Sequence, residues 1–160
     1  MHFVKVIEVE HFTADYFRFK TLKPDGYDFK AGEFAAIGLE DKKVLRAYSF
    51  TSAPEDDFLE FYSIKIADGP LTSRLQHISI GDYIALAEKT TGTITLDFIE
   101  PGGTLWMLAT GTGIAPFISI LRHGQTAKLF EKIHVVWSCR IHEEHTAYHQ
   151  FLSELPIEYS

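Results

Sequence analysis

The segment "RAYSFTS", Arg46–Ser52, places a cation, an aromatic ring and a hydroxyl group close together. Arg46 offers a planar guanidinium whose donors match a pair of phosphate oxygens. Tyr48 can stack on a flat ring, and Ser49 can hydrogen-bond a ring heteroatom. An arginine at the rim of a fold and a tyrosine in its core would explain the same residues. From these residues alone, a ligand site and ordinary packing both stay open.

A second segment, "GPLTSRL" at Gly69–Leu75, carries a glycine and a proline where a helix is expected to begin. The first amides of a helix are unpaired and lie at the positive end of its dipole, so they bind phosphate. Together with Arg46, this segment could hold one pyrophosphate group. A plain connecting helix is the alternative interpretation.

A third segment, "ATGTGIAPF" at Ala109–Phe117, follows an apolar run and begins an expected helix. A glycine loop in that position commonly holds the phosphates of a dinucleotide. The segment lacks the third glycine of the usual fingerprint. A simple strand-to-helix turn therefore explains it equally well.

The elements that would position these residues change in kind along the chain. Residues 1–99 contain short β-rich segments separated by turns such as "KPDG" at Lys23–Gly26, and one helix is expected near Leu71–Ile78. The segments expected to form strands are 3–9, 16–22, 33–39, 45–52, 58–66, 83–88 and 92–98. Six or seven strands at this spacing predict a small antiparallel barrel.

Residues 100–160 alternate between strand and helix patterns. The runs "TLWMLA" and "KIHVVWSC" are continuously apolar, as in strands buried on both faces, so we expect Trp106 and Trp137 in the core. Helices are expected over 111–123 and 142–155, and this order predicts a parallel sheet. Because two such strands rarely form a stable sheet alone, the barrel or another chain must support them, or the sequence is a truncated form.

Composition narrows the classes of function. Of the 160 residues 46% are hydrophobic, and the net charge is −7 without a basic stripe, which argues against a nucleic-acid partner. The single cysteine, Cys139, excludes an internal disulfide and fits a reducing compartment such as the cytoplasm. The stretch Pro101–Leu121 lacks charged residues, but its glycines and prolines argue against a membrane span.

Three histidines suggest a metal site that their spacing does not support. His142, His145 and His149 would share one face of the expected helix, yet the order H-E-E-H differs from the H-E-x-x-H arrangement of zinc enzymes. No further ligand is evident, so we predict a solvated polar face and no metal. Cys139 is predicted to be a small core residue, with a reactive thiol as the alternative.

The order of these motifs resembles the ferredoxin–NADP reductase family in its bacterial subclass. The shared features are R-x-Y-S in a strand, a G-x-x-T helix start and a G-T-G-x-A-P loop, together with "EFYSIK" and "VVWSCR". The resemblance covers nearly the whole chain. It implies an FAD-binding antiparallel barrel over residues 1–99, followed over 100–160 by part of an NADP-binding α/β domain with a parallel sheet.

The same resemblance implies roles for individual residues. Arg46 would contact the FAD pyrophosphate, Tyr48 would stack on the isoalloxazine, and Ser49 would lie near the reactive flavin nitrogen, so Tyr48 and Ser49 are the catalytic candidates. Arg140 would meet the adenosine phosphate of NADP(H), although the neighbouring Glu143 and Glu144 keep NADH possible. The implied cofactor-binding residues are Arg46, Ala47, Tyr48, Ser49, Tyr62, Ser63, Ile64, Lys65, Pro70, Leu71, Thr72, Ser73, Thr110, Gly111, Thr112, Gly113, Pro116 and Arg140.

The implied activity is hydride transfer between nicotinamide and flavin, followed by one-electron exchange with ferredoxin or flavodoxin. The alternatives are a reductase of free flavin or of an oxygenase, and a flavin-binding module without full reductase activity. In this family the second domain normally continues through further strands. We therefore expect weaker flavin retention and impaired NADP chemistry if these 160 residues are the whole polypeptide.

Overall fold

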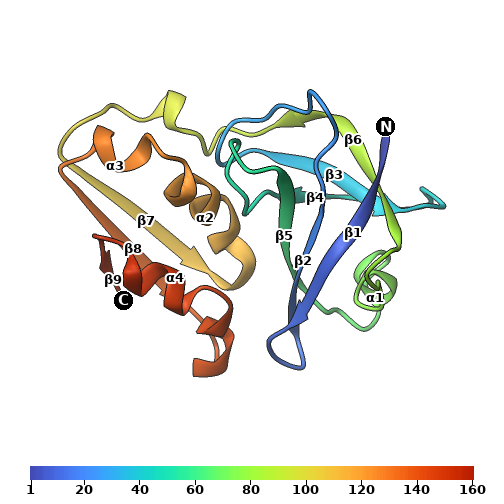
Figure 1. Cartoon of the computed structure of the whole chain (residues 1–160). Coiled ribbons are helices and arrows are strands. Elements are labelled where there is room, and N and C mark those ends of the chain that lie inside the picture. The colour runs from blue at the N-terminus through green and yellow to red at the C-terminus, as the bar shows by residue number, and fades with distance from the viewer.

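The computed structural model describes residues 1–160, which form two sheets joined by loops and short helices (Figure 1). The first sheet is antiparallel and has the strand order β4-β3-β6-β1-β2-β5. A bridge between Phe50 and Phe61 brings its two edge strands together, which confirms the predicted barrel. Its strands are β1 (His2–His11), β2 (Tyr16–Leu22), β3 (Phe34–Leu39), β4 (Leu45–Ser49), β5 (Phe58–Ile64) and β6 (Tyr83–Thr91).

Aromatic side chains fill the inside of the barrel. The ring of Phe50 lies 4.1 Å from that of Phe29 and 5.4 Å from that of Phe61, measured between centroids. Phe17 and Phe19 on β2 are completely buried in the same cluster, because alternate residues of a strand face the same side. The expected helix at 71–78 is shorter than predicted: α1 spans Thr72–Leu75 and packs through Leu75.

The last strand expected in the barrel is absent. Residues 92–98 leave the sheet and form only a 3-10 turn, η1 (Leu96–Phe98). The strand before them is instead longer than expected, because Thr90 and Thr91 of β6 still pair with Ala35 and Phe34 of β3. Gly92 then adopts a φ of 145°, a conformation that favours glycine and ends the strand.

The second sheet is parallel and has the order β7-β8-β9, as the alternating pattern predicted. Its strands are β7 (Thr104–Thr110), β8 (Lys132–Ser138) and β9 (Glu158–Tyr159). The connections contain η2 (Gly111–Ile114), α2 (Ala115–Arg122), α3 (Thr126–Leu129), η3 (His142–Ala147) and α4 (His149–Glu154). No helix of the protein has the length and apolar content required to cross a bilayer.

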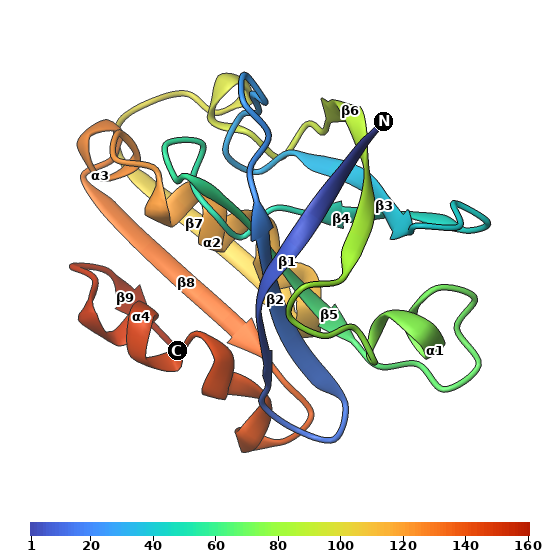
Figure 2. The ribbon, with the colours of Figure 1, turned by 45° about the vertical axis from the view of Figure 1, so that its right-hand side comes forward.

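The prediction that β7 and β8 are buried on both faces is wrong. Met107 and Trp137 are buried against α2 and α4, but Trp106 is 58% exposed and Leu108 is 67% exposed. These two side chains lie on the opposite face of the sheet, where Trp106 stacks on His134 with ring centroids 4.2 Å apart. The helices cover one face only, so an apolar sequence run does not become a doubly buried strand here (Figure 2).

The helix expected over 142–155 is broken in two at Tyr148, whose φ of −134° and ψ of 3° are not helical. Its ring is buried among aromatic neighbours, 5.3 Å from the ring of Tyr62. Glu144 is also buried, whereas His142 and His149 are exposed and His145 is half-buried, so the face that carries the three histidines is largely solvated as predicted. Packing of Tyr148 against the barrel therefore overrides the helical pattern.

Candidate functional site

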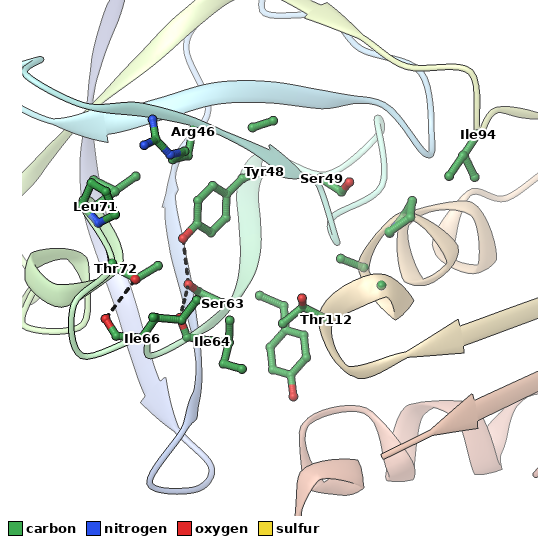
Figure 3. Close-up of a pocket in the computed structure, with 17 residues that line it drawn as sticks. Arg46, Tyr48, Ser49, Ser63, Ile64, Ile66, Leu71, Thr72, Ile94 and Thr112 are labelled. Carbon is green, nitrogen blue, oxygen red and sulfur yellow. Dashed lines mark hydrogen bonds between the residues drawn. The ribbon is translucent and has the colours of Figure 1, made fainter. Parts of the chain in front are cut away.

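A cavity of about 500 Å³ lies where the barrel meets the second region (Figure 3). Its wall is formed by β4, the end of β5, the loop into α1 and the loop after β7. The residues that line it are Arg46, Ala47, Tyr48, Ser49, Tyr62, Ser63, Ile64, Ile66, Gly69, Pro70, Leu71, Thr72, Ile94, Thr112, Gly113, Ala115 and Pro116. This volume lies in the range of small-molecule sites, about 300–1,000 Å³.

Tyr48 is held in place on the barrel side of the cavity. Its ring packs edge-on against Phe61, and its phenol oxygen lies 2.9 Å from Oγ of Ser63 (Figure 3). Burial raises the pKa of Tyr48 above its usual range, and the hydrogen bond with Ser63 opposes that shift in part. A neutral phenol with a fixed ring provides a flat apolar surface for a stacked ligand.

Arg46 has no ion-pair partner. Its side chain is exposed beside the cavity and donates a hydrogen bond from Nη1 to the carbonyl of Leu45, at 2.8 Å. By contrast, Arg74 on α1 pairs with Asp41 at 2.7 Å. Because its charge is not neutralised by a carboxylate, Arg46 is available to bind a phosphate group.

The loop before α1 forms the floor beside Arg46. Oγ1 of Thr72 donates to the carbonyl of Ile66 at 3.2 Å and closes this loop (Figure 3). A Cβ atom at position 69 would lie 2.1 Å from that same Oγ1, so the close approach requires glycine. The amide of Ser73 donates to the carbonyl of Gly69, and Ser73 does not line the cavity.

The glycine loop faces β4 from the other side. Thr112 and Gly113 line the cavity, and a Cβ at Gly113 would meet no atom within 4 Å. Gly111 has a φ of 49°, and its carbonyl accepts a hydrogen bond from Nε1 of Trp137 at 2.8 Å. The loop thus begins anchored to β8 and ends against the cavity.

Five of the residues that the resemblance implied do not line the cavity: Lys65, Ser73, Thr110, Gly111 and Arg140. Arg140 lies at the end of β8, where Nη2 contacts Oε1 of Glu144 at 3.0 Å and Oδ2 of Asp15 at 3.2 Å. Because Asp15 and Glu144 neutralise it, the guanidinium of Arg140 is far less available to bind a phosphate than that of Arg46.

Sequence reasoning missed two lining residues, Ile66 and Ile94. Gly69 and Ala115 also line the cavity, and both belong to the two segments that were expected to bind phosphate or nucleotide. Ile94 was assigned to a strand that does not exist, and only the irregular path of residues 92–98 brings it to the cavity.

The lining residues include no carboxylate, histidine or cysteine. The hydroxyl groups of the lining residues, such as those of Tyr48 and Ser49, therefore have no base beside them in the cavity wall that would activate them as nucleophiles. An aromatic platform, an unpaired guanidinium and two glycine-containing loops suit a flat ligand that carries phosphate. The donor set on the barrel side thus fits a flavin nucleotide.

Comparison with known proteins agrees with this chemistry. Residues 107–160 match the family described as "Oxidoreductase NAD-binding domain". Ferredoxin–NADP reductase A of Sorangium cellulosum is 45% identical over 137 residues, which are 84% of this chain and 49% of that protein. Flavodoxin/ferredoxin–NADP reductase of Rhodobacter capsulatus is 48% identical over 138 residues, 84% of this chain and 51% of that protein.

A solved structure extends the likeness to the fold. A crystal structure of a ferredoxin NADP+ reductase from Neisseria gonorrhoeae, with bound FAD and NADP, superposes with a TM-score of 0.92 at 32% identity. The alignment covers 99% of this chain and 66% of that one. The chain spans about half the length of the two curated relatives named above.

Proposed function

The chain belongs to the ferredoxin–NADP reductase family, and we propose that it binds FAD and NADP(H) and transfers electrons between NADP(H) and ferredoxin or flavodoxin. One observation carries this proposal: Arg46, Tyr48 and Ser49 of the barrel share a single cavity with Thr112 and Gly113 of the glycine loop. A flavin held by the first group would therefore face a nicotinamide held by the second.

A bound flavin would supply the chemistry, because a flavin accepts one hydride, which carries two electrons, and releases these electrons one at a time. The residues of the chain would bind this flavin and orient its ring. Arg46 would hold the pyrophosphate, the fixed ring of Tyr48 would support the flavin ring, and the hydroxyl of Ser49 would hydrogen-bond near the reactive nitrogen. Hydride transfer to a flavin requires no general acid or base from the protein, so these residues would act through position and electrostatics.

Arg140 is proposed to bind the adenosine phosphate of NADP(H). It would have to exchange its contact with Asp15, or with Glu144, for the phosphate. Because breaking such a contact costs free energy, we expect only a weak preference for NADPH over NADH. The rates of flavin bleaching with each nucleotide measure that preference. We divide the chain into an FAD-binding part, 1–99, and a nucleotide-binding part, 100–160, and place the activity in the cytoplasm, which suits the free thiol of Cys139.

The test is the visible absorption spectrum of the purified chain with FAD, recorded before and after NADPH is added without oxygen. We expect a flavin band that bleaches with NADPH and returns when ferredoxin or flavodoxin is supplied. A band that never bleaches would leave a flavin-binding module and contradict the reductase proposal. Equal turnover with free flavin and no response to ferredoxin would favour a flavin reductase instead.

The variant Tyr48→Ala serves as the site control, because it removes the platform and leaves the rest of β4 in place. The loss of the flavin band in this variant, with the far-ultraviolet circular dichroism unchanged, would link binding to the cavity. An unchanged flavin affinity would place the flavin elsewhere.

A further inference from the structure

Glu60 is a charged residue in the middle of β5, yet only 1% of its surface is exposed. Its neighbours Leu59 and Phe61 are completely buried in the barrel cluster, so Glu60 points away from the barrel. Tyr62, which shares the outward face with Glu60, packs in the core of the second region. Glu60 is therefore covered by the second region and lies between the two parts.

Both parts of the chain contribute partners to this carboxylate. Oε1 of Glu60 accepts hydrogen bonds from Oγ1 of Thr51 at 2.8 Å, from Nη1 of Arg122 at 2.8 Å and from the phenol of Tyr148 at 3.1 Å. Thr51 belongs to the barrel, whereas Arg122 ends α2 and Tyr148 precedes α4. A single carboxylate oxygen thus joins three segments that are distant in sequence.

The surrounding charges balance. Oε2 of Glu60 lies 3.6 Å from Nε of Arg18 and 3.9 Å from Nζ of Lys20. Arg18 is also paired with Glu10, and Lys20 with Glu8. With Arg122, three cations face three carboxylates, so the buried charge of Glu60 is neutralised locally. A change at one of them leaves its partners uncompensated.

Arg122 also connects this cluster to the cavity. The same Nη1 atom donates to the carbonyl of Thr51 at 2.9 Å, and Oγ of Ser119 on the same helix donates to the carbonyl of Ser52 at 2.7 Å. The other end of α2 begins at Ala115 and Pro116, which line the cavity. A helix of eight residues is a rigid rod of about 12 Å. Contacts at one end of α2 therefore fix the position of the other end.

We propose that Glu60 and Arg122 are positioning residues, which set where α2 holds the glycine loop relative to Tyr48. This inference rests on the proposed function, because the distance between flavin and nicotinamide is what such a placement would control. Hydride transfer needs reacting atoms about 3–3.5 Å apart, and a misplacement of about 1 Å can cost roughly 100-fold in rate. Neither residue lines the cavity, so neither is expected to touch a cofactor.

The first test needs no cofactor. Amide hydrogen exchange is measured by mass spectrometry on the full chain, as wild type and as Arg122→Met, which keeps the apolar stem and removes the charge. We expect exchange over residues 111–122 to rise at least tenfold, with strands β1 and β2 unchanged. The matched control is Lys128→Met on the adjacent helix α3. Lys128 is exposed and forms no ion pair, so its replacement should change exchange in neither segment.

The second test uses FAD and NADPH. In Arg122→Met the dissociation constant for FAD should stay within about twofold of wild type, because Arg46 and Tyr48 are intact, while the rate of anaerobic bleaching falls roughly tenfold. Arg122→Lys keeps a charge in reach of Glu60 and should restore most of the rate. If Arg122 only stabilised the fold, its replacement would weaken FAD binding and slow bleaching to a similar extent.

Two results would overturn the inference: unchanged exchange over 111–122 in Arg122→Met, or an equal rise in 111–122 and in the barrel strands. If Arg122→Met does not fold, Ser119→Ala is used instead, because it removes a neutral contact of the same helix. Either of the same two exchange results in Ser119→Ala would then overturn the inference. If wild type never bleaches with NADPH, the proposed function fails, and the hydrogen exchange still decides whether Glu60 and Arg122 hold α2.

Discussion

The barrel and the second region differ in how completely each one buries its apolar side chains within its own residues. In the barrel, the bridge between Phe50 and Phe61 joins the two edge strands, and its core cluster contains only residues before position 99. The parallel sheet has an open edge at β7 and an open face that carries Trp106 and Leu108. Its core also includes Tyr16 and Tyr62, which belong to the barrel.

This difference shows that the two regions depend on each other unequally. The barrel has a core of its own, whereas the second region completes its core with side chains that the barrel provides. Contacts between them, such as those of Glu60, fix the cavity that lies at their boundary. The sharpest experiments therefore treat the regions separately.

The largest expected effect is the loss of the second region's fold when the barrel is removed. A chain of residues 100–160 would lack Tyr16 and Tyr62, which complete the core under α2 and α4, and the other face of its short sheet is already open, so it should be unfolded. A chain of residues 1–99 should keep β-sheet structure. Far-ultraviolet circular dichroism and cooperative thermal unfolding measure both. A folded 100–160 would show that the two regions are equally independent.

A matched pair of aromatic substitutions compares the two sheets directly. Phe61→Ala empties the barrel core, where its ring contacts Phe19 and Phe50, and should lower the free energy of unfolding by about 3–5 kcal/mol. Trp106→Ala removes an exposed ring and its stacking on His134, and should cost under about 1.5 kcal/mol. Urea denaturation of both variants gives the values. Equal losses would mean that the face of β7 is covered in solution.

Cys139 probes the end of the second sheet next to the glycine loop. Burial, with a smaller contribution from Glu144, raises its pKa from 9.0 to about 11. At pH 8 the folded chain should therefore react with iodoacetamide about 100-fold more slowly than the chain unfolded in guanidinium. The single cysteine makes the alkylation unambiguous by mass spectrometry. Equal rates in both states would show that this end of β8 is open to solvent.

The same shift has a consequence for stability. Because the pKa of Cys139 is higher in the folded state, that state holds the proton more tightly. The stabilisation is complete below about pH 9 and is lost as the pH rises toward about 11. A Cys139→Ser variant should lack this part of the alkaline decline in urea midpoint, and an identical decline in both proteins would contradict the assignment.

The smallest effect is expected from a comparison of Arg46, which lines the cavity, with Arg74 on α1. Arg46→Ala removes the unpaired guanidinium and should weaken FAD binding about tenfold, the value of one charge-assisted hydrogen bond. Arg74→Ala breaks only the pair with Asp41 and should leave FAD affinity within about twofold, since Arg74 does not line the cavity. Titration of FAD fluorescence compares them. Equal weakening would mean that general positive charge attracts the cofactor.

Much of the site could be predicted from the sequence. The residues of "RAYSFTS" and "GPLTSRL" line one cavity because the barrel closes through the bridge between Phe50 and Phe61, and such a barrel was predicted from the number and spacing of the strands. The partnerships of Arg140 with Asp15 and of Glu60 with Arg122 join segments far apart in the chain. No periodicity or motif spacing records such contacts, because they form only when the two sheets pack together.

The sequence pattern alone was enough to predict the six strands of the barrel and the strand–helix alternation after it. Those properties follow from side-chain period and turn residues, which act over a few positions, whereas the roles of the residues in the cavity wall followed from the family resemblance. The exposure of Trp106, the break in the helix at Tyr148 and the position of Ile94 in the cavity wall depend instead on how the two sheets and their loops pack together. Burial depends on which surfaces meet in the folded chain. An apolar strand has the same sequence pattern whether helices cover one of its faces or both.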